Sequence, residues 1–224
     1  MNTRPLVAVM QPYFLPYTGY FRLFEMADVF IYLDSVQFPR RGFVHRNRFV
    51  SANNLGDWLT LSIAKSPVHT SIKDLQLHPD TDRLMRSRLD QYSAFSKKDP
   101  LADEIAEVIL SASGSAADLI IRLTDIILDA LDICCLRVRA SDLSEPTNVT
   151  AQERIISLVK QVGGTAYINS PGGRDLYERE VFVKNNIELD FLPPFKGSNL
   201  SVVQDVVDHG VGYVAEDVRN QCAM

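Results

Sequence analysis

Short apolar runs alternate with amphipathic segments along this chain of 224 residues. Residues 6–10, Leu-Val-Ala-Val-Met, form a continuous apolar run of the kind found in strands that are buried on both faces. From Thr18, the predicted N-cap of a helix, apolar residues follow helical spacing, and residues 29–33 form a second buried run. A strand, a polar loop, a helix and a strand within about 30 residues predict a βαβ unit, and therefore a parallel sheet.

The rest of the chain continues this alternation around a central helical region. Helical character dominates residues 80–132, where apolar residues recur at helical spacing. Residues 150–153, Thr-Ala-Gln-Glu, form a capping box that opens a helix running to Val162. The other predicted elements are strands at 58–65, 72–77, 133–140, 165–168 and 187–192, a short helix before the last strand, and a last helix at 201–208. We therefore predict an α/β protein with a Rossmann-like, mostly parallel sheet and helices on both faces.

The composition is that of an ordinary globular protein and argues against several classes of function. Hydrophobic residues make up 46% and charged residues 23%, so we expect one domain over residues 1–224, with residues 80–132 as a helical insertion or subdomain. The net charge of −5 provides no field that would attract nucleic acid, so an anionic ligand requires a local basic cluster. No apolar run approaches the roughly 20 residues that span a bilayer, and the N-terminal segment lacks the apolar region of a signal peptide. We expect a cytoplasmic protein.

The three cysteines are not expected to form a metal site or a disulfide framework. Cys134 and Cys135 are adjacent, so on a strand their side chains point to opposite faces, and no Cys-x-x-Cys spacing is present. His69, His78 and His209 are isolated, without a spacing that suits a metal. We therefore predict no metal site, and the sequence does not identify a cofactor.

Three polar segments follow predicted strands, at the positions where open parallel sheets bind their ligands. The first, residues 11–19, contains Gln11 and Tyr13, and Tyr20 follows it in the helix. Aromatic hydroxyl groups on a stiff, proline-rich loop suit a sugar, a nucleobase or a phosphate that approaches free backbone N–H groups. The alternative is a proline-rich turn whose tyrosines pack on the edge of the core. We favour the binding role because the loop follows a buried strand.

The second polar segment begins at Asp34, ends at Arg48 and is strongly basic for an acidic protein. Arg46 and Arg48 supply guanidinium groups for bidentate contact with carboxylate or phosphate, and Asn47 lies between them. His45 could act as a catalytic base or donor, and Asp34 could orient a histidine or pair with an arginine. The alternative is a solvated basic loop, but the density of the cluster favours anion binding.

The third polar segment, residues 169–174, contains Gly172 and Gly173 followed by Arg174, with Tyr177 shortly beyond. Two glycines permit close approach of a ligand to the backbone, and the next helix offers N–H groups to an anion. The spacing is neither that of a P-loop nor that of a dinucleotide-binding fingerprint. A plain helix-opening turn is an equally good interpretation of these residues.

Six segments distributed along most of the chain, from residue 11 to residue 205, resemble the WbqC-like protein family. The most specific is Gln-Pro-Tyr-Phe-Leu-Pro-Tyr-Thr-Gly-Tyr-Phe at 11–21. The chain departs from the family pattern at Tyr17, where tryptophan is commoner, and at His45, where asparagine is expected. The six segments are residues 11–21, 28–38, 46–48, 58–60, 170–177 and 200–205.

This resemblance implies a place in the synthesis of bacterial surface polysaccharides, such as the O-antigen of lipopolysaccharide and capsule. It also implies a transferase that moves an amino acid or another acyl group to an amino-sugar or nucleotide-sugar intermediate. The expected ligand is therefore a small sugar or nucleotide sugar. The resemblance strengthens the prediction that Arg46, Asn47 and Arg48 contact the ligand. It weakens the prediction that His45 is catalytic.

Two alternatives stay open. The start of the chain is more distantly similar to HIGH-motif nucleotidyltransferases and pantothenate synthetases, which implies an ATP- or nucleotide-binding enzyme. Those enzymes hold triphosphate with two histidines in the loop, where this chain has Tyr17 and Tyr20. The other alternative is a non-catalytic ligand-binding protein of the same pathway. The helical region 80–132 could also form the face of a homo-oligomer, although covering the core is the commoner use of such helices.

Overall fold

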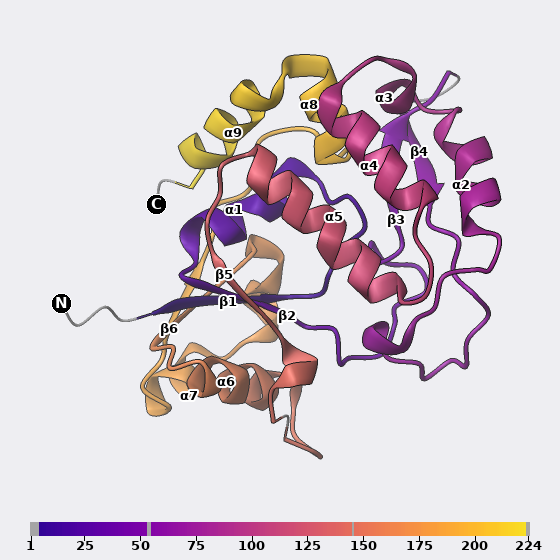
Figure 1. Cartoon of the computed structure of the whole chain (residues 1–224). Helices are drawn as coiled ribbons and strands as arrows, with labels where there is room; N and C mark the ends of the chain where they lie inside the picture. Colours follow the sequence, from indigo (N-terminus) through magenta and orange to yellow (C-terminus); the bar gives the residue numbers. More distant parts are fainter. Residues whose placement is uncertain (1–4, 53–54, 145, 223–224) are drawn as a thin grey trace.

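The central feature of the computed structural model is a parallel sheet of five strands (Figure 1). The structure describes residues 5–52, 55–144 and 146–222. Within them the strands of the sheet are β1 (Leu6–Met10), β2 (Val29–Tyr32), β5 (Leu136–Arg139), β6 (Ala166–Asn169) and β7 (Glu188–Phe191). They lie in the order β5-β2-β1-β6-β7, and each neighbouring pair is parallel. The predicted α/β class and the mostly parallel sheet are confirmed.

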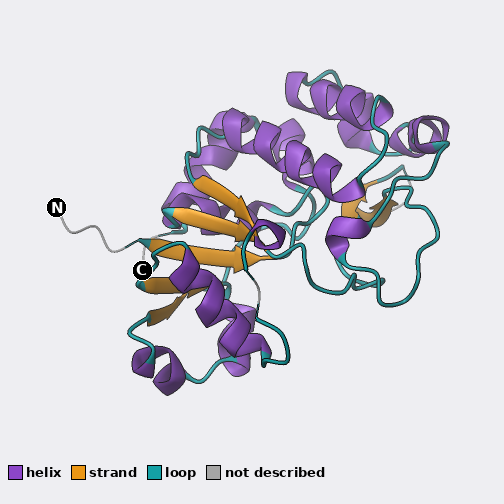
Figure 2. Ribbon diagram, turned by 60° about the horizontal axis from the view of Figure 1, so that its bottom comes forward, coloured by secondary structure: helices purple, strands orange, loops and turns teal. Residues whose placement is uncertain are grey.

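Helices cover both faces of this sheet (Figure 2). One face carries α1 (Thr18–Met26) and α5 (Ala116–Ala130), and the other carries α6 (Ala151–Gln161) and α7 (Arg179–Lys184). The alternation of side chains along β1 explains the two layers, because Ala8 packs into the core on the α1 side while Val7 and Val9 pack against α6. A strand that is buried in this way on both faces requires the continuous apolar run at residues 6–10.

A long segment separates β2 from β5, although these strands are neighbours in the sheet. It contains an antiparallel hairpin of β3 (Arg46–Val50) and β4 (Leu55–Thr60), then α2 (Thr81–Leu89), α3 (Ser93–Ser96), α4 (Pro100–Leu110) and finally α5. The hairpin lies beside the sheet, with α2 and α3 next to it (Figure 1). Phe49 of β3 packs against the rings of Tyr92 and Phe95. The helices predicted within residues 80–132 are therefore α2 to α5, of which α5 lies on the sheet.

The strand predicted at residues 72–77 is wrong. The segment forms a 3-10 helix at Ile72–Asp74 instead. The amide of Ile72 donates to the carbonyl oxygen of Val36, at 3.0 Å, and the end of the stretch makes isolated bridges, Ile63 with Leu77 and Gln76 with Ser115, rather than a continuous strand. An apolar run alone does not distinguish these two outcomes.

The chain has a further helix after the one predicted to be its last. α8 (Val202–His209) matches the prediction at residues 201–208, and α9 (Val211–Asn220) follows it directly. Gly210, with φ of +89°, separates the two helices, because a left-handed residue cannot continue an α-helix. The glycine therefore marks a bend between two helices rather than the end of the helical region.

Two predicted helix starts had different outcomes. The capping box at Thr150 is present, with the Thr150 hydroxyl accepting from the amide of Glu153 and the Glu153 carboxylate accepting in return. Thr18, by contrast, is the first helical residue of α1 rather than its N-cap. Its hydroxyl donates to the Asp205 carboxylate at 2.5 Å, which ties the start of α1 to α8.

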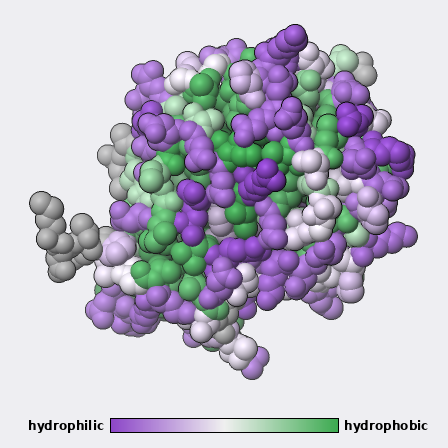
Figure 3. Space-filling model, viewed as in Figure 1, coloured by the Kyte–Doolittle hydropathy of each residue, from purple (hydrophilic) through white to green (hydrophobic). Residues whose placement is uncertain are grey.

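The surface is dominated by hydrophilic residues, and apolar residues reach it in separate patches on the face shown in Figure 3. Leu136 on the edge strand β5 and Leu176 after β6 are among the exposed apolar side chains. Within the described residues, no helix has the length and apolar character that a membrane crossing requires.

Candidate functional site

The strand order creates a topological switch point between β1 and β6. β1 is followed by α1 on one face of the sheet, whereas β6 is followed by α7 on the other, so the two connections diverge. Between them, at the carboxyl ends of the strands, lies a cavity of about 390 Å³. Its lining includes Gln11 and Tyr13 after β1, and Asn169, Gly172 and Tyr177 at and after the end of β6. The fold thus brings together side chains from the first and third predicted segments.

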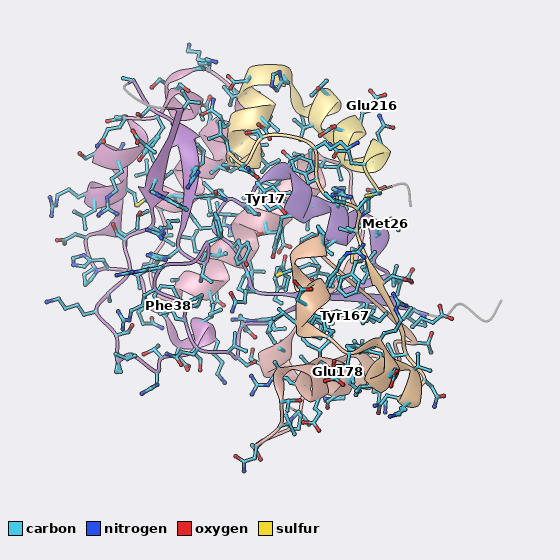
Figure 4. The ribbon with its side chains drawn as sticks, turned by 180° about the vertical axis from the view of Figure 1, so that it is seen from behind. Tyr17, Met26, Phe38, Tyr167, Glu178 and Glu216 are labelled. Carbon is cyan, nitrogen blue, oxygen red and sulfur yellow. The ribbon has the colours of Figure 1, made fainter. Side chains whose placement is uncertain are left out.

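A smaller cavity of about 210 Å³ adjoins the first and shares Met10, Tyr13 and Ser170 with it. It extends over the start of α1, where Tyr17 lies (Figure 4), and Phe43 is also among its lining residues. We call the two cavities together the switch-point crevice. Its combined size falls within the range of small-molecule sites, about 300–1,000 Å³.

Three tyrosines at the start of the chain line the switch-point crevice, and one of them also holds the loop. Tyr20 is 2% exposed, and its hydroxyl donates to the backbone carbonyl of Gln11 at 2.9 Å. Tyr13 and Tyr17 are half-buried, and loss of solvent raises the pKa of both phenols. These two hydroxyl groups therefore stay protonated near neutral pH, where they can donate hydrogen bonds but cannot act as bases.

The proline-rich loop is held in a strained shape by Asn47. Leu15 has φ of 45°, a left-handed conformation that is rare for a residue with a branched side chain. The buried amide of Asn47 donates to the carbonyl oxygen of Leu15 at 2.7 Å. Asn47 was predicted to contact a ligand, but its side chain points inward and supports the crevice loop.

The two glycines of the third segment have different surroundings. A Cβ atom on Gly173 would lie 2.5 Å from Nδ2 of Asn169, so this glycine makes room for a buried side chain of the protein. A Cβ atom on Gly172 would meet nothing within 4 Å, and Gly172 is exposed at the crevice wall. Of the two glycines, therefore, only Gly172 leaves room for a ligand to approach the backbone closely.

An aromatic row leads from the crevice to the hairpin. The ring centroids of Tyr13 and Phe43 are 5.7 Å apart, and those of Phe43 and Trp58 are 5.6 Å apart. Phe43 is 41% exposed, so part of its ring is open to solvent beside the smaller cavity that it lines. We use the term aromatic row for Tyr13, Phe43 and Trp58.

Arginine side chains pack on aromatic rings at two places, on Trp58 of the aromatic row and on Phe191 at the end of β7. The guanidinium carbons of Arg46 and Arg48 lie 4.2 and 5.0 Å from the ring centroid of Trp58, within cation–π distance. Arg174 lies 5.2 Å from the ring centroid of Phe191, at the carboxyl end of β7. The guanidinium groups of Arg48 and Arg174 have no protein acceptor among the described residues, so both can receive an anion. The basic segment was predicted as a loop, but Arg46 begins strand β3, and its alternation turns Asn47 inward and the two arginines outward.

Asp34 lies outside the crevice and is fully engaged by the protein. Its carboxylate is completely buried and accepts from Nε of Arg139 at 2.7 Å, and from the amide and hydroxyl of Ser141 at 3.0 and 2.8 Å. The predicted pairing with an arginine exists, but the partner is Arg139 rather than a residue of the basic segment. Asp34 therefore joins the carboxyl ends of β2 and β5, and no crevice residue contacts it through a hydrogen bond within the described part of the chain.

His45, the other predicted catalytic residue, lines a different cavity under the hairpin. Its ring packs edge-on against Phe38, with centroids 4.9 Å apart. Burial, and after it the charge of Arg46, lowers the pKa of His45 to about 4, so the ring is neutral near pH 7. The structure thus separates His45 from Arg46, its neighbour in the sequence, and from the crevice.

Phe43 and Ser170 line the crevice but carried no strong signal in the sequence. Phe43 stands in a short loop between Gly42 and Val44, where an apolar residue is usually interpreted as core. Only its exposure, and its position between Tyr13 and Trp58, indicates a contact surface. Both observations require the three-dimensional structure.

These features define a class of protein, a parallel α/β fold with a crevice lined by polar and aromatic side chains at its topological switch point. The chain belongs to the WbqC-like protein family, whose pattern matches residues 11–198. It is 28% identical over 188 residues to the uncharacterized protein Rv1507c of Mycobacterium tuberculosis (strain ATCC 25618 / H37Rv), a match that covers 82% of this chain and 80% of that protein. No solved structure matches the chain significantly.

Proposed function

We propose that the protein is a transferase that binds a nucleotide-linked amino sugar in the switch-point crevice and transfers an amino-acid or other acyl group to its amine. The observation that carries this proposal is the continuity of the neutral crevice with the aromatic row, which ends at two arginines. A nucleotide sugar combines the matching groups, namely a hydroxylated ring, a diphosphate and a planar base. The polysaccharide setting implied by the family resemblance supports the same class of ligand.

The crevice has the composition of a sugar site. Gln11, Tyr13, Ser170 and Tyr177 offer amide and hydroxyl groups, which can both donate to and accept from the hydroxyl groups of a sugar. Because the phenol of Tyr13 stays protonated and no charged side chain lines the described wall, the crevice does not select for an ion. A neutral polyol or an uncharged amine is the ligand that such a surface accommodates best.

The aromatic row and its arginines suit the nucleotide. The exposed ring of Phe43 offers a face on which a base can stack, a contact worth about 1–3 kcal/mol in other systems. Arg48 has donors without a protein acceptor among the described residues, and a diphosphate is a natural partner for a guanidinium group. The position of both beside the crevice supports a single extended ligand rather than two separate ones.

The proposed chemistry is direct attack of the sugar amine on an activated acyl carbon. A new C–N bond forms, the bond from the acyl carbon to its leaving group, a thiolate or a phosphate, breaks, and the amine proton passes to that leaving group or to water. The step uses no thiol of the protein, since no cysteine is among the described residues that line the crevice, and burial raises the pKa of Cys135 to about 11 and also raises that of Cys222. The crevice then acts by orienting the two reactants, which alone supplies large rate effects.

The test is an assay of UDP- and dTDP-linked amino sugars with acyl-coenzyme A and acyl-phosphate donors, read by mass spectrometry. The acceptor should gain the mass of the acyl group. Phe43→Ala should lower kcat/KM by about tenfold or more, as expected when a stacking partner is removed. Tyr213→Ala is the matched control, since it also removes an aromatic ring, and Tyr213 is 61% exposed on α9 and lies outside the crevice lining.

The same experiment separates the proposal from the two alternatives. Binding of the nucleotide sugar that depends on Phe43, with no product from any donor, would identify a non-catalytic binding protein and contradict the transferase. Turnover that requires ATP, with release of pyrophosphate, would favour the nucleotidyltransferase-like alternative. Product formed equally well by the wild type and Phe43→Ala would place the reaction outside the crevice.

A further inference from the structure

A second cavity, of about 380 Å³, lies beneath the hairpin on the side of α2 and is separate from the switch-point crevice in its lining residues. Its floor is apolar and includes Phe38, Leu61 and Leu84. Phe38, labelled in Figure 4, stands well apart from Tyr17 of the crevice. We call this cavity the cationic pocket, for the side chains that surround its floor.

Positively charged and imidazole side chains gather in the wall of the cationic pocket. Arg40, Lys65 and Arg88 contribute three fixed charges, and His45 and His78 contribute two rings. No carboxylate is present among the described residues that line it. In a chain with a net charge of −5, a wall with three cations and no acid produces a local field that attracts an anion.

The donors of this wall are only partly used by the protein. One terminal nitrogen of Arg88 donates to the carbonyl oxygen of Thr60 and to the hydroxyl of Ser62, at 2.5 and 2.9 Å. The other N–H groups of this guanidinium are left for a ligand. The ammonium group of Lys65 has no acceptor among the described residues, and its side chain is exposed.

The two histidines of the pocket differ in the hydrogen bonds that their ring nitrogens make. Nδ1 of His78 accepts from the amide of Asp80 at 3.1 Å, so in the neutral ring the proton is on Nε2, which is a donor. Nδ1 of His45 is buried without a hydrogen-bond partner among the described residues. A buried polar atom without a partner is costly, and such atoms often mark functional sites.

We propose that the cationic pocket is a second ligand site, which binds the phosphate group of a small organic phosphate. Three cations and the Nε2 donor of His78 match the charge and the several acceptor oxygens of a phosphate dianion better than those of a carboxylate. The apolar floor is then covered by the organic part of the same molecule. This site is additional to the crevice and does not depend on the transfer reaction proposed above.

The test follows the four histidine rings of the protein by NMR during titration at pH 7 with inorganic phosphate and, separately, with phenyl phosphate. The signals of His45 and His78 should shift along a saturating curve, while that of His209, which lies outside the pocket lining and packs against Tyr213, should stay unchanged. Assignment uses single His→Gln variants. Phenyl phosphate should bind at least about threefold more tightly, because its ring covers apolar surface.

Lys65→Ala and Lys98→Ala provide a matched pair of variants. Both remove one exposed lysine, but only Lys65 lines the pocket. Lys65→Ala should weaken phosphate binding about three- to tenfold at constant ionic strength, and Lys98→Ala should leave it unchanged. The proposal is overturned if all histidine signals drift together without saturation, if the two variants behave alike, or if inorganic and phenyl phosphate bind equally.

Discussion

The switch-point crevice and the cationic pocket differ in how the chain builds them. The crevice joins residues 11–13 to residues 169–177, which the order β2-β1-β6 brings to one edge of the sheet. The pocket is made by residues between 38 and 88, all within the segment that separates β2 from β5. The first is a product of topology, and the second is a product of one local segment.

The two regions also differ in charge. Neutral hydroxyl and amide groups line the crevice together with apolar side chains, and its described lining residues include no charged one, whereas the pocket has cations in its wall. A single basic segment is divided between the pocket and the aromatic row, because His45 lines the pocket while the guanidinium group of Arg46 lies over Trp58. Residues that are adjacent in the sequence can therefore belong to different sites.

The largest effect on stability is expected from a substitution of Asp34. This substitution tests whether Asp34 belongs to an active site separate from both the crevice and the pocket. Asp34→Ala leaves the partly buried Arg139 with only the exposed Asp118 as a partner and should lower the free energy of unfolding by about 3 kcal/mol in urea denaturation. Asp190→Ala, which removes an exposed pair with Arg179, is the control and should cost less than about 0.5 kcal/mol. An active site at Asp34 would instead give a stable variant without activity.

A smaller effect should separate the adjacent glycines of the crevice wall. Gly173→Ala places a Cβ atom 2.5 Å from the Asn169 amide and should cost about 1–3 kcal/mol of unfolding free energy. Gly172→Ala has open space and should be close to neutral for stability, so a loss of ligand affinity there would report contact with the ligand. Equal destabilisation by both changes would contradict the described packing.

Phe43→Ala should distinguish the crevice from the pocket through binding rather than stability. Loss of its exposed ring should weaken binding of a nucleotide sugar about tenfold by calorimetry, since stacking contributes roughly 1–3 kcal/mol. Lys65→Ala, in the pocket wall, should leave that affinity unchanged. The comparison of two separate sites fails if Lys65→Ala weakens nucleotide-sugar binding as much as Phe43→Ala does.

The smallest effect concerns the pH dependence of stability at His45. Its folded pKa of about 4 lies below the ordinary value near 6.5, so the unfolded chain binds the extra proton between these values. The free energy of unfolding should therefore fall as pH is lowered from about 6.5 to 4, by about 1 kcal/mol because the ring is partly exposed. His45→Asn should lack this part of the pH dependence in denaturation curves, and an unchanged curve would contradict the low pKa.

The sequence was sufficient to predict the central strands of the sheet, but it predicted the arrangement of the candidate site only in part. Continuous apolar runs predicted the strands at residues 6–10 and 29–33, since strands buried on both faces tolerate few polar residues. Placing Gln11 and Tyr13 beside Gly172 also followed from the rule that ligands bind at strand ends. The separation of His45 from Arg46 could not be predicted, because the basic segment had no strand pattern strong enough to show which way each side chain faces.

Some candidate residues proved to have supporting roles that only tertiary contacts reveal. Tyr20 and Asn47 are polar residues in the right segments, yet both are buried and hold backbone carbonyl groups of the crevice loop. Phe43 shows the reverse, an apolar residue that stays exposed. Burial of this kind depends on contacts between distant parts of the chain, which local patterns do not encode.

The most direct test of the proposed function is a structure or saturation-transfer NMR measurement of the protein with a UDP-linked amino sugar. The proposal predicts sugar protons close to Tyr13 and Tyr177 and base protons close to Phe43, and both sets of signals should disappear together when excess UDP displaces the ligand. A nucleotide sugar that binds only beside His45 and Phe38 in the cationic pocket, and leaves the crevice signals unchanged, would contradict it.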